Sequence, residues 1–343
     1  MSSSILIIYT GGTIGMKEDP SDGTLKPFDF SQIKEEVPEL NKFAVRLDSY
    51  TFDPLIDSSD VEPSLWISLA QLILDRYDDY DGFVILHGTD TMAYSASTLS
   101  FMLEGLTKPV VFTGSQLPIG VPRTDGKENL ISAVEIAAAK DSEGHARVPE
   151  VSIYFDSKLM RGNRTSKLSA EDFNAFQSTN WPPLAEAGIN IRYNKSAIRY
   201  PASWSQPLTV RSRLDTRVAV LKLHPGITPE MMRVFLCAPE IRAVILETYG
   251  SGNALSKPWF TDIIREATAL GKILLNVTQC TAGSVNMDLY ATGKSLKEAG
   301  VVSGHDITTE AALGKLFVLM GQSDDNGWVK AWLGENLSGE ISK

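Results

Sequence analysis

The sequence predicts an α/β protein made of two domains, each with an open parallel sheet. Three observations lead to this fold class. The chain has 343 residues, about twice the length of a typical domain. Short apolar runs rich in β-formers alternate with helical patterns, which is the rhythm of a parallel sheet. The same rhythm restarts after an irregular segment that contains two prolines.

The first half of the chain contains four strand-like runs, at residues 5–9, 83–86, 110–112 and 151–155. Between them, residues 64–76 carry leucines and isoleucine at helical spacing, and residues 129–140 repeat that pattern. These elements predict a β–α alternation in the first domain.

An interdomain linker is expected around residues 200–207, which lack periodicity and hold Pro201 and Pro207. Beyond it, strands are expected at 218–221, 243–246 and 273–275, and helices at 229–237, at 258–270 and after Thr309. The predicted division is therefore a catalytic α/β domain at 1–195, a linker at 196–214 and a C-terminal α/β domain at 215–343.

The composition limits the classes of partner. A formal net charge of -10 argues against nucleic acid and anionic membranes, which both attract basic surfaces. The start of the chain has no basic residue, and no apolar run approaches the roughly 18 residues of a membrane span. Cys237 and Cys280 are the only cysteines, as expected in a reducing compartment. We expect an intracellular protein with a small-molecule ligand.

Three hydroxyl-rich loops directly follow predicted strands, at residues 10–13, 87–91 and 113–116. Ligands of open parallel sheets bind outside the carboxyl ends of the strands, so these loops are expected to line one crevice. Each loop could also serve only as a turn and helix cap. We expect that simpler role for Thr91 as a cap, and for Thr113 and Ser115.

Other chemistries lack their motifs. Residues 250–255 end in leucine where a dinucleotide fingerprint needs glycine or alanine, and 293–295 lack the earlier glycine of a phosphate loop. There is no G-x-S-x-G or H-E-x-x-H, and the four histidines are scattered singly, as structural histidines are. A hydroxyl nucleophile then needs another base, and a neutral lysine beside an acid is one solution. Lys167, in a polar segment after the strand at 151–155, is a candidate.

Several segments together resemble the asparaginase family, specifically the cytoplasmic type I enzymes of bacteria. The matching segments, which span nearly the whole chain, are residues 9–16, 57–60, 78–103, 161–167, 276–280 and 290–293. The resemblance implies a larger flavodoxin-like N-terminal domain and a smaller C-terminal α/β domain. It also implies hydrolysis of L-asparagine to L-aspartate and ammonia, with neither a metal nor an organic cofactor.

The resemblance also implies a role for each matching site residue. Thr13 would attack the side-chain amide carbon and form an acyl-threonine intermediate. Thr89, Asp90 and Lys167 would form the activating group, with Lys167 as proton acceptor. The substrate-binding residues would be Asp57, Ser58, Ser59, Thr89 and Asp90.

The family further implies a cytoplasmic homodimer or homotetramer with sites near the subunit interface, and no nucleic acid or membrane partner. Two departures stand out. No tyrosine lies between Tyr9 and Tyr50, where many relatives place one on the nucleophile, and Thr24 in a lid at residues 17–30 is our candidate replacement. Glu247 stands where some relatives have an arginine of an allosteric asparagine site.

Three alternatives remain at this stage. The nearest is a glutaminase or a mixed asparaginase/glutaminase. An amidotransferase subunit acting on misacylated tRNA shares the fold, but carries an added N-terminal domain and would not be expected to be this acidic. A binding protein without catalysis is disfavoured because Thr13, Thr89, Asp90 and Lys167 occur together.

Overall fold

The computed structural model describes residues 3–18, 25–27 and 37–342. It divides into two compact units, Met1–Val210 and Arg211–Lys343. Thr209 and Val210, which we expected in the linker, form β14 (Thr209–Val210) and pair with β6 (Leu103–Glu104) in the first unit. No helix among the described residues is long and apolar enough to cross a membrane.

Five neighbouring parallel strands form the main part of the first unit's sheet. They are β4 (Val45–Thr51), β1 (Ser3–Tyr9), β5 (Gly82–Leu86), β7 (Val110–Thr113) and β8 (Val151–Phe155), in that spatial order. Numbered along the chain, the order is 2-1-3-4-5, which is the flavodoxin-like order. The predicted fold class of this domain is therefore confirmed.

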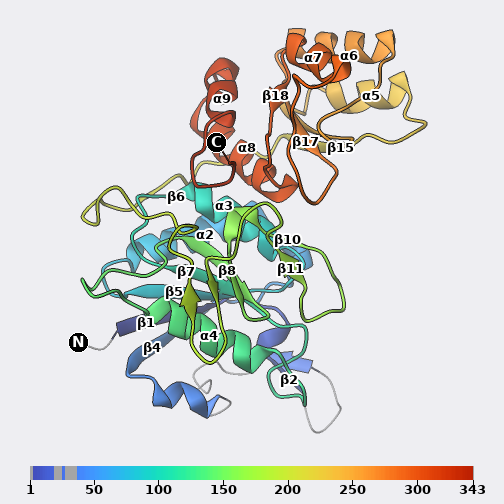
Figure 1. The fold of residues 1–343 in the computed structure, drawn as a ribbon. Helices are drawn as coiled ribbons and strands as arrows, with labels where there is room; N and C mark the ends of the chain where they lie inside the picture. Colours follow the sequence, from blue (N-terminus) through green and yellow to red (C-terminus); the bar gives the residue numbers. More distant parts are fainter. Residues whose placement is uncertain (1–2, 19–24, 28–36, 343) are drawn as a thin grey trace. The chain divides into compact units, whose positions relative to one another are not determined.

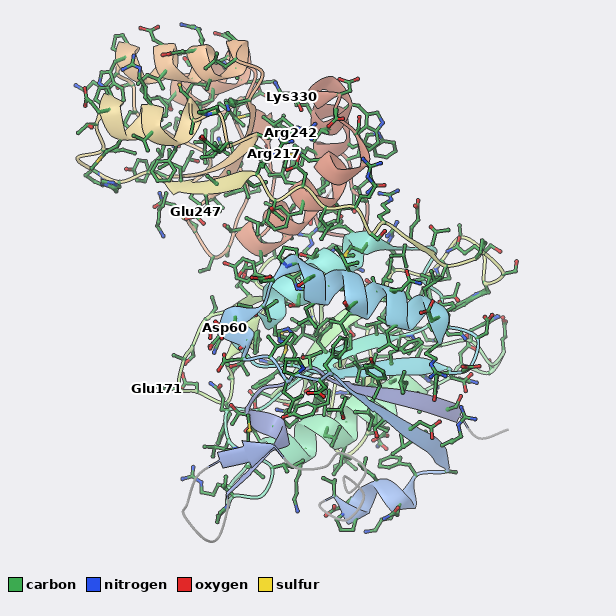
Figure 2. All side chains as sticks on the ribbon, turned by 180° about the vertical axis from the view of Figure 1, so that it is seen from behind. Asp60, Glu171, Arg217, Arg242, Glu247 and Lys330 are labelled. Carbon is green, nitrogen blue, oxygen red and sulfur yellow. The ribbon has the colours of Figure 1, made fainter. Side chains whose placement is uncertain are left out.

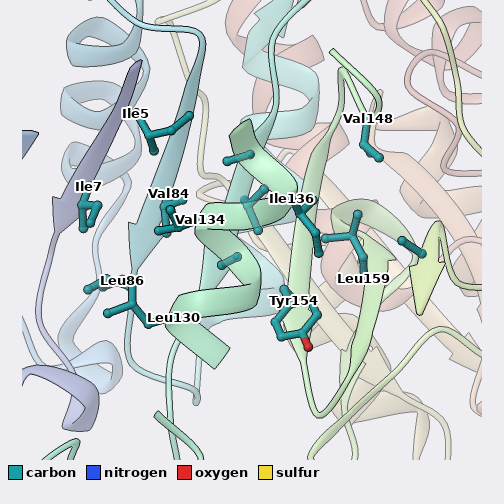
Figure 3. Packing of buried hydrophobic residues seen from close by; sticks show 14 of the residues in the cluster. Ile5, Ile7, Val84, Leu86, Leu130, Val134, Ile136, Val148, Tyr154 and Leu159 are labelled. Carbon is teal, nitrogen blue, oxygen red and sulfur yellow. The ribbon is translucent and has the colours of Figure 1, made fainter. Parts of the chain in front are cut away.

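Helices cover both faces of this sheet, which explains why its strands are apolar at successive positions. On one face, α4 (Gly126–Ala138) packs Leu130 and Val134 into the same buried cluster as Val84 and Leu86 of β5 (Figure 3). On the other face lie α2 (Pro63–Asp75) and α3 (Met92–Met102) (Figure 1).

The first sheet is not parallel throughout, in contrast to the prediction. Three antiparallel strands extend it beyond β8, namely β9 (Lys158–Arg161), β12 (Ala185–Glu186) and β13 (Arg192–Tyr193). The tight turn between β8 and β9 reverses the chain, with positive φ at Asp156 (46°) and Ser157 (62°). Such a turn joins antiparallel strands directly, without a crossover helix.

The second unit has a four-stranded parallel sheet, β15 (Val218–Lys222), β16 (Ala243–Thr248), β17 (Ile273–Thr278) and β18 (Val302–Ser303), in chain order. Buried side chains of α5 (Pro229–Leu236) and α6 (Pro258–Ala269) form one core with β15, β16 and β17. The unit also contains α7 (Ala291–Glu298), α8 (Thr309–Gln322) and α9 (Asn326–Leu333).

Short elements complete the fold. The strands are β2 (Met16–Glu18), β3 (Leu25–Pro27), β10 (Ser166–Lys167) and β11 (Phe176–Gln177). The 3-10 helices are η1 (Thr13–Gly15), η3 (Pro38–Lys42), η4 (Ser58–Asp60) and η5 (Gly162–Arg164). Several of these carry the predicted site residues.

Candidate active site

The predicted site lies where the strand order of the first sheet reverses. β1 has β4 on one side and β5 on the other, so the chain leaves β1 toward one edge and later returns to its opposite side. In open α/β sheets this switch point, at the carboxyl ends of the strands, is the usual place for a ligand. The loops at 10–13 and 87–91 follow the carboxyl ends of β1 and β5.

Glycines let these loops approach each other at backbone distance. A Cβ atom on Gly12, whose φ is 93°, would lie 2.5 Å from the backbone nitrogen of Gly88. A Cβ atom on Gly88 would lie 2.4 Å from Oγ of Ser58. Both positions therefore require glycine, and the segments carrying Thr13, Ser58 and Thr89 pack directly together.

Thr13 begins η1 at the end of the first loop and is partly exposed. Its side-chain hydroxyl makes no hydrogen bond to any residue that the structure describes. The expected lid residue Thr24 lies outside the described residues, so its proposed bond to Thr13 stays a prediction.

Lys167 contacts both residues that were expected to accompany it. Its Nζ donates to Oγ1 of Thr89 at 2.8 Å and to Oδ1 of Asp90 at 2.7 Å. The lysine side chain is 17% exposed and that of Asp90 is 64% exposed, so the amine is largely covered while the carboxylate faces solvent. The structure thus brings together three residues from two distant segments of the chain.

A buried segment precedes Lys167. Arg161 and Glu150 form a buried ion pair, with Nη2 to Oε1 at 3.0 Å, and Arg164 is fully buried with its guanidinium over the Trp181 ring. Lys167 itself is paired with Phe176 in the β10–β11 ladder. This arrangement explains why a basic, polar stretch is not a solvated loop.

The segment at 57–59 stands beside the same loops. The Asp57 carboxylate accepts the backbone N–H of Ser59 at 2.9 Å and its hydroxyl at 2.8 Å, and these bonds lower the pKa of Asp57. Asp57 and Ser59 are exposed, whereas Ser58 is buried. Figure 2 shows Asp60, which ends η4, on the same side of the first unit as Glu171, four residues beyond Lys167.

Thr91 occupies the N-cap position of α3, but its side chain does not cap the helix. Its hydroxyl donates to the carbonyl of Ser58 at 2.6 Å and ties the second loop to the 57–59 segment. The expected helix-capping role is therefore wrong, because the side chain turns toward the Ser58 carbonyl and its oxygen accepts no N–H of the helix. Thr113 and Ser115 donate to nearby carbonyl oxygens, those of Tyr154 and Leu117, as expected for structural hydroxyls.

His87, directly before Gly88, is a neutral structural histidine. Burial lowers the pKa of His87 to about 4. Nδ1 lies 2.7 Å from the carbonyl oxygen of Gly88, which can only accept, so Nδ1 carries the proton. Nε2 then accepts from Ser95, 2.9 Å away, whose oxygen in turn accepts from Trp66 at 2.8 Å.

Sequence reasoning missed two polar residues of this region. Gln116 has its Oε1 at 3.4 Å from Oγ1 of Thr89, and Asp125 holds the backbone of Gln116 through hydrogen bonds at 3.0 and 3.1 Å. The signal available for Gln116 was its place in the third strand-end loop. Among the described residues, no group of three or more histidine, cysteine or acidic side chains could hold a metal ion.

Glu247 belongs to the second unit (Figure 2). Its Oε1 accepts the Thr309 hydroxyl at 2.7 Å, and its Oε2 lies 3.9 Å from Nζ of Lys222. The carboxylate is thus engaged with the start of α8 and with β15.

Comparisons with known proteins show the family of this chain. The family model described as "Asparaginase, N-terminal" matches residues 4–199, and "Glutaminase/Asparaginase C-terminal domain" matches residues 217–333. The chain belongs to the asparaginase family. Its membership agrees with the resemblance described from the sequence.

Relatives match this asparaginase-family chain over almost its full length. L-asparaginase 1 of Escherichia coli (strain K12) is 43% identical, over 99% of this chain and 98% of the relative. The crystal structure of L-asparaginase I from Vibrio cholerae matches with a TM-score of 0.90 and 42% identity, over 100% of both chains. The thermostable L-asparaginase from Thermococcus kodakarensis matches with a TM-score of 0.88 and 30% identity, over 99% of both chains.

Proposed function

We propose that this chain hydrolyses L-asparagine to L-aspartate and ammonia, with Thr13 as the nucleophile. The observation that carries the proposal is the contact of Lys167 Nζ with Thr89 and Asp90, on a loop packed against the loop of Thr13. Membership of the asparaginase family supports the same reaction.

The first half-reaction forms an ester. Thr13 Oγ1 attacks the side-chain amide carbon of the substrate while its proton passes to neutral Lys167. The carbon–nitrogen bond then breaks, and the nitrogen leaves as ammonia with that proton. In the second half-reaction, water attacks the ester carbon, and its proton passes through Lys167 to Thr13 Oγ1 as aspartate is released.

The remaining residues bind the two charged ends of the substrate. Anionic Asp57 and Asp90 would pair with the α-ammonium group. The hydroxyls of Ser58 and Ser59 would face the α-carboxylate, with Ser59 exchanging its hydroxyl bond to Asp57 for one to the substrate while its N–H stays on Asp57. The lowered pKa of Asp57 supports this role, because it keeps the carboxylate ionised to lower pH.

Release of ammonia and aspartate from L-asparagine by the purified chain tests the proposal, with Thr13→Ala as the matched variant. We expect turnover by the parent and a loss of about 100-fold or more in the variant, which lacks the attacking oxygen. An inactive parent would reject the function, and a Thr13→Ala rate within tenfold of the parent would place the nucleophile elsewhere.

Glutamine is the alternative substrate, because the matching C-terminal family model covers glutaminases as well. One extra methylene costs about 1 to 3 kcal/mol in a fitted pocket, so we expect kcat/KM to favour asparagine by roughly 10- to 200-fold. Equal values for the two amides would favour the mixed or glutaminase function.

We also propose a homodimer or homotetramer in the cytoplasm. The family resemblance supports the assembly, and the two free thiols, Cys237 and Cys280, support a reducing compartment. Light scattering during size-exclusion chromatography should give at least twice the chain mass of 37.5 kDa, and a single-chain mass at working concentrations would reject the assembly.

A further inference from the structure

We propose that Gln116 is a positioning residue that orients the Thr89 hydroxyl and thereby leaves the lone pair of Lys167 free for the proton of Thr13. This inference rests on the proposed function and goes beyond it, because it assigns a role to a side chain outside the predicted set. It also distinguishes the roles of the two threonines.

The orientation of the Gln116 amide is fixed by two backbone acceptors. Its Nε2 donates to the carbonyl oxygens of Ala170 at 3.3 Å and Asp172 at 3.1 Å. A flipped amide would place Oε1 against two oxygens that cannot donate. The amide nitrogen therefore faces the 170–172 loop, and Oε1 faces Thr89.

The backbone of Gln116 is held as firmly as its side chain. The Asp125 carboxylate accepts the N–H of Gln116 at 3.0 and 3.1 Å and the N–H of Leu117 at 3.2 Å. The same carboxylate accepts Nδ2 of Asn129, 3.2 Å away in α4. Gln116 is thus anchored on one side to a helix and on the other to the loop that follows Lys167.

The fixed amide determines the direction of the Thr89 hydroxyl. Oε1 of Gln116 carries no hydrogen, so the 3.4 Å contact requires Thr89 to donate its single proton to Gln116. Thr89 Oγ1 is then available to Lys167, 2.8 Å away, only as an acceptor.

The N–H groups of neutral Lys167 are all engaged by Thr89 and Asp90. A neutral amine has two N–H groups and one lone pair. One N–H is taken by Thr89 Oγ1 and the other by the Asp90 carboxylate, which also only accepts. The lone pair remains for a third group, and in the proposed reaction that group is the Thr13 hydroxyl.

Loss of the Gln116 acceptor would free the Thr89 hydroxyl to change direction. The Thr89 hydroxyl could then turn and donate to the lone pair of Lys167, which would occupy the base before Thr13 can use it. Gln116 therefore acts through Thr89, and its removal should slow the chemical step rather than weaken the binding of asparagine.

Steady-state kinetics of Gln116→Met and Gln116→Glu test the role, with Gln71→Met on α2 as the matched control. We expect Gln116→Met to lower kcat by about tenfold or more with KM within about threefold, and Gln71→Met to behave as the parent. Gln116→Glu keeps an acceptor for Thr89, but it loses the two bonds to Ala170 and Asp172 and adds a negative charge near Lys167. Its rate should recover at alkaline pH, whereas that of Gln116→Met should not.

The outcomes separate this inference from the proposed function. A parent that releases no ammonia from asparagine would reject the function itself. An active parent with an unchanged kcat in Gln116→Met would overturn the positioning role, and so would equal pH profiles in both Gln116 variants.

Neutron diffraction on the deuterated protein gives a test that needs no turnover. We expect the deuterium of the Thr89 hydroxyl to point toward Oε1 of Gln116. A deuterium bonded to Thr89 Oγ1 and pointing at Lys167 Nζ, in place of a lysine deuterium pointing at Thr89, would overturn the proposal, whatever the activity of the chain.

Discussion

At the scale of single residues, the chemistry proposed here depends on a lysine that can lose its proton. Lys167 lies within 2.8 Å of one hydroxyl oxygen and one carboxylate oxygen, so its geometry suits either charge state. What distinguishes a proton acceptor from a fixed positive charge is whether the side chain can become neutral.

Lys167→Arg tests that distinction, because a guanidinium group does not lose its proton at working pH. We expect kcat with asparagine to fall by about 100-fold or more, the usual scale of a general-base contribution. Lys140→Arg is the matched control, since Lys140 also pairs with an aspartate, Asp81, at 2.9 Å in the same unit. A Lys167→Arg enzyme that keeps most of the rate would mean that the lysine supplies only charge.

His87 makes the stability of the fold depend on pH. The folded pKa of about 4 lies below the unfolded value of about 6.5, so the unfolded chain binds the proton first as the pH falls. The neutral histidine's contribution is therefore complete above about pH 6.5 and is lost as the pH falls toward about 4. Over that window the free energy of unfolding should decrease by about 3 kcal/mol from this residue.

Denaturant unfolding of the parent and of His87→Gln, at pH 7 and at pH 4.5, measures this effect. We expect a smaller acid-induced loss of stability in His87→Gln than in the parent. His224 is exposed, so His224→Gln should lose as much free energy of unfolding between pH 7 and pH 4.5 as the parent does. The same acid-induced loss in all three proteins would contradict the assignment.

The sequence was sufficient to nominate Thr13, Thr89, Asp90 and Lys167, because all four stand in segments that resemble the motifs of one family. It was insufficient for Gln116, because the proposed role of this residue depends on contacts with distant segments. Thr89 donates to its amide oxygen, and the carbonyl oxygens of Ala170 and Asp172 accept from its amide nitrogen. The sequence also misjudged Thr91, because capping propensity is local while the carbonyl toward which its side chain turns, that of Ser58, lies 33 residues away.

At the scale of elements, the long apolar strands were predictable, whereas others, α3 and β4 among them, were not. α3 is buried on nearly all sides, and its own buried residues include small ones such as Ser95, Ala96 and Ser97. It therefore shows no amphipathic period. β4 is an edge strand with Arg46, Asp48 and Ser49, and lacks the apolar run of a central strand. In both cases tertiary position, rather than local pattern, determines the structure.

The two units share one stabilising device that local patterns also do not reveal. Lys108, just before β7, donates through Nζ to the carbonyl oxygens of Tyr77 and Tyr80 after α2. Lys272, just before β17, donates likewise to those of Ala238 and Ile241 after α5. Each amine satisfies carbonyl groups of the turn that follows a helix.

Lys272→Met should therefore destabilise the fold, since it keeps the apolar stem and leaves the two carbonyl oxygens without their donor. Lys272 is buried, so we expect a loss of about 1 to 3 kcal/mol in the free energy of unfolding. The exposed Lys297→Met should lose less than about 1 kcal/mol, as surface ion pairs do. Equal effects would show that the carbonyl contacts of Lys272 contribute little.

At the scale of the whole molecule, the two units differ in strand order. The first sheet reverses its order between β1 and β5, and the predicted catalytic threonines follow these strands. The described strands of the second sheet follow chain order without a reversal, so this sheet offers no switch point of the same kind. The β–α rhythm predicted both sheets, but the sequence alone could not order their strands.

A buried ion pair joins residue Glu340 to α8 within the second unit. Nζ of Lys315 in α8 lies 2.6 Å from Oε1 of Glu340, and both side chains are 0% exposed. Glu340→Ala would leave the ammonium buried without its counter-ion, so we expect a loss of about 3 to 5 kcal/mol on denaturant unfolding. The exposed Glu298→Ala should change stability by less than about 0.5 kcal/mol, and a Glu340→Ala effect that small would contradict the account.

The most direct test of the central claim is to trap the acyl-enzyme. The parent chain is mixed with L-asparagine, quenched in acid during turnover, digested and analysed by mass spectrometry. We expect an aspartyl ester on the peptide that contains Thr13, absent from the same peptide of Thr13→Ala. An ester on Thr89 in the turning-over parent would contradict the account.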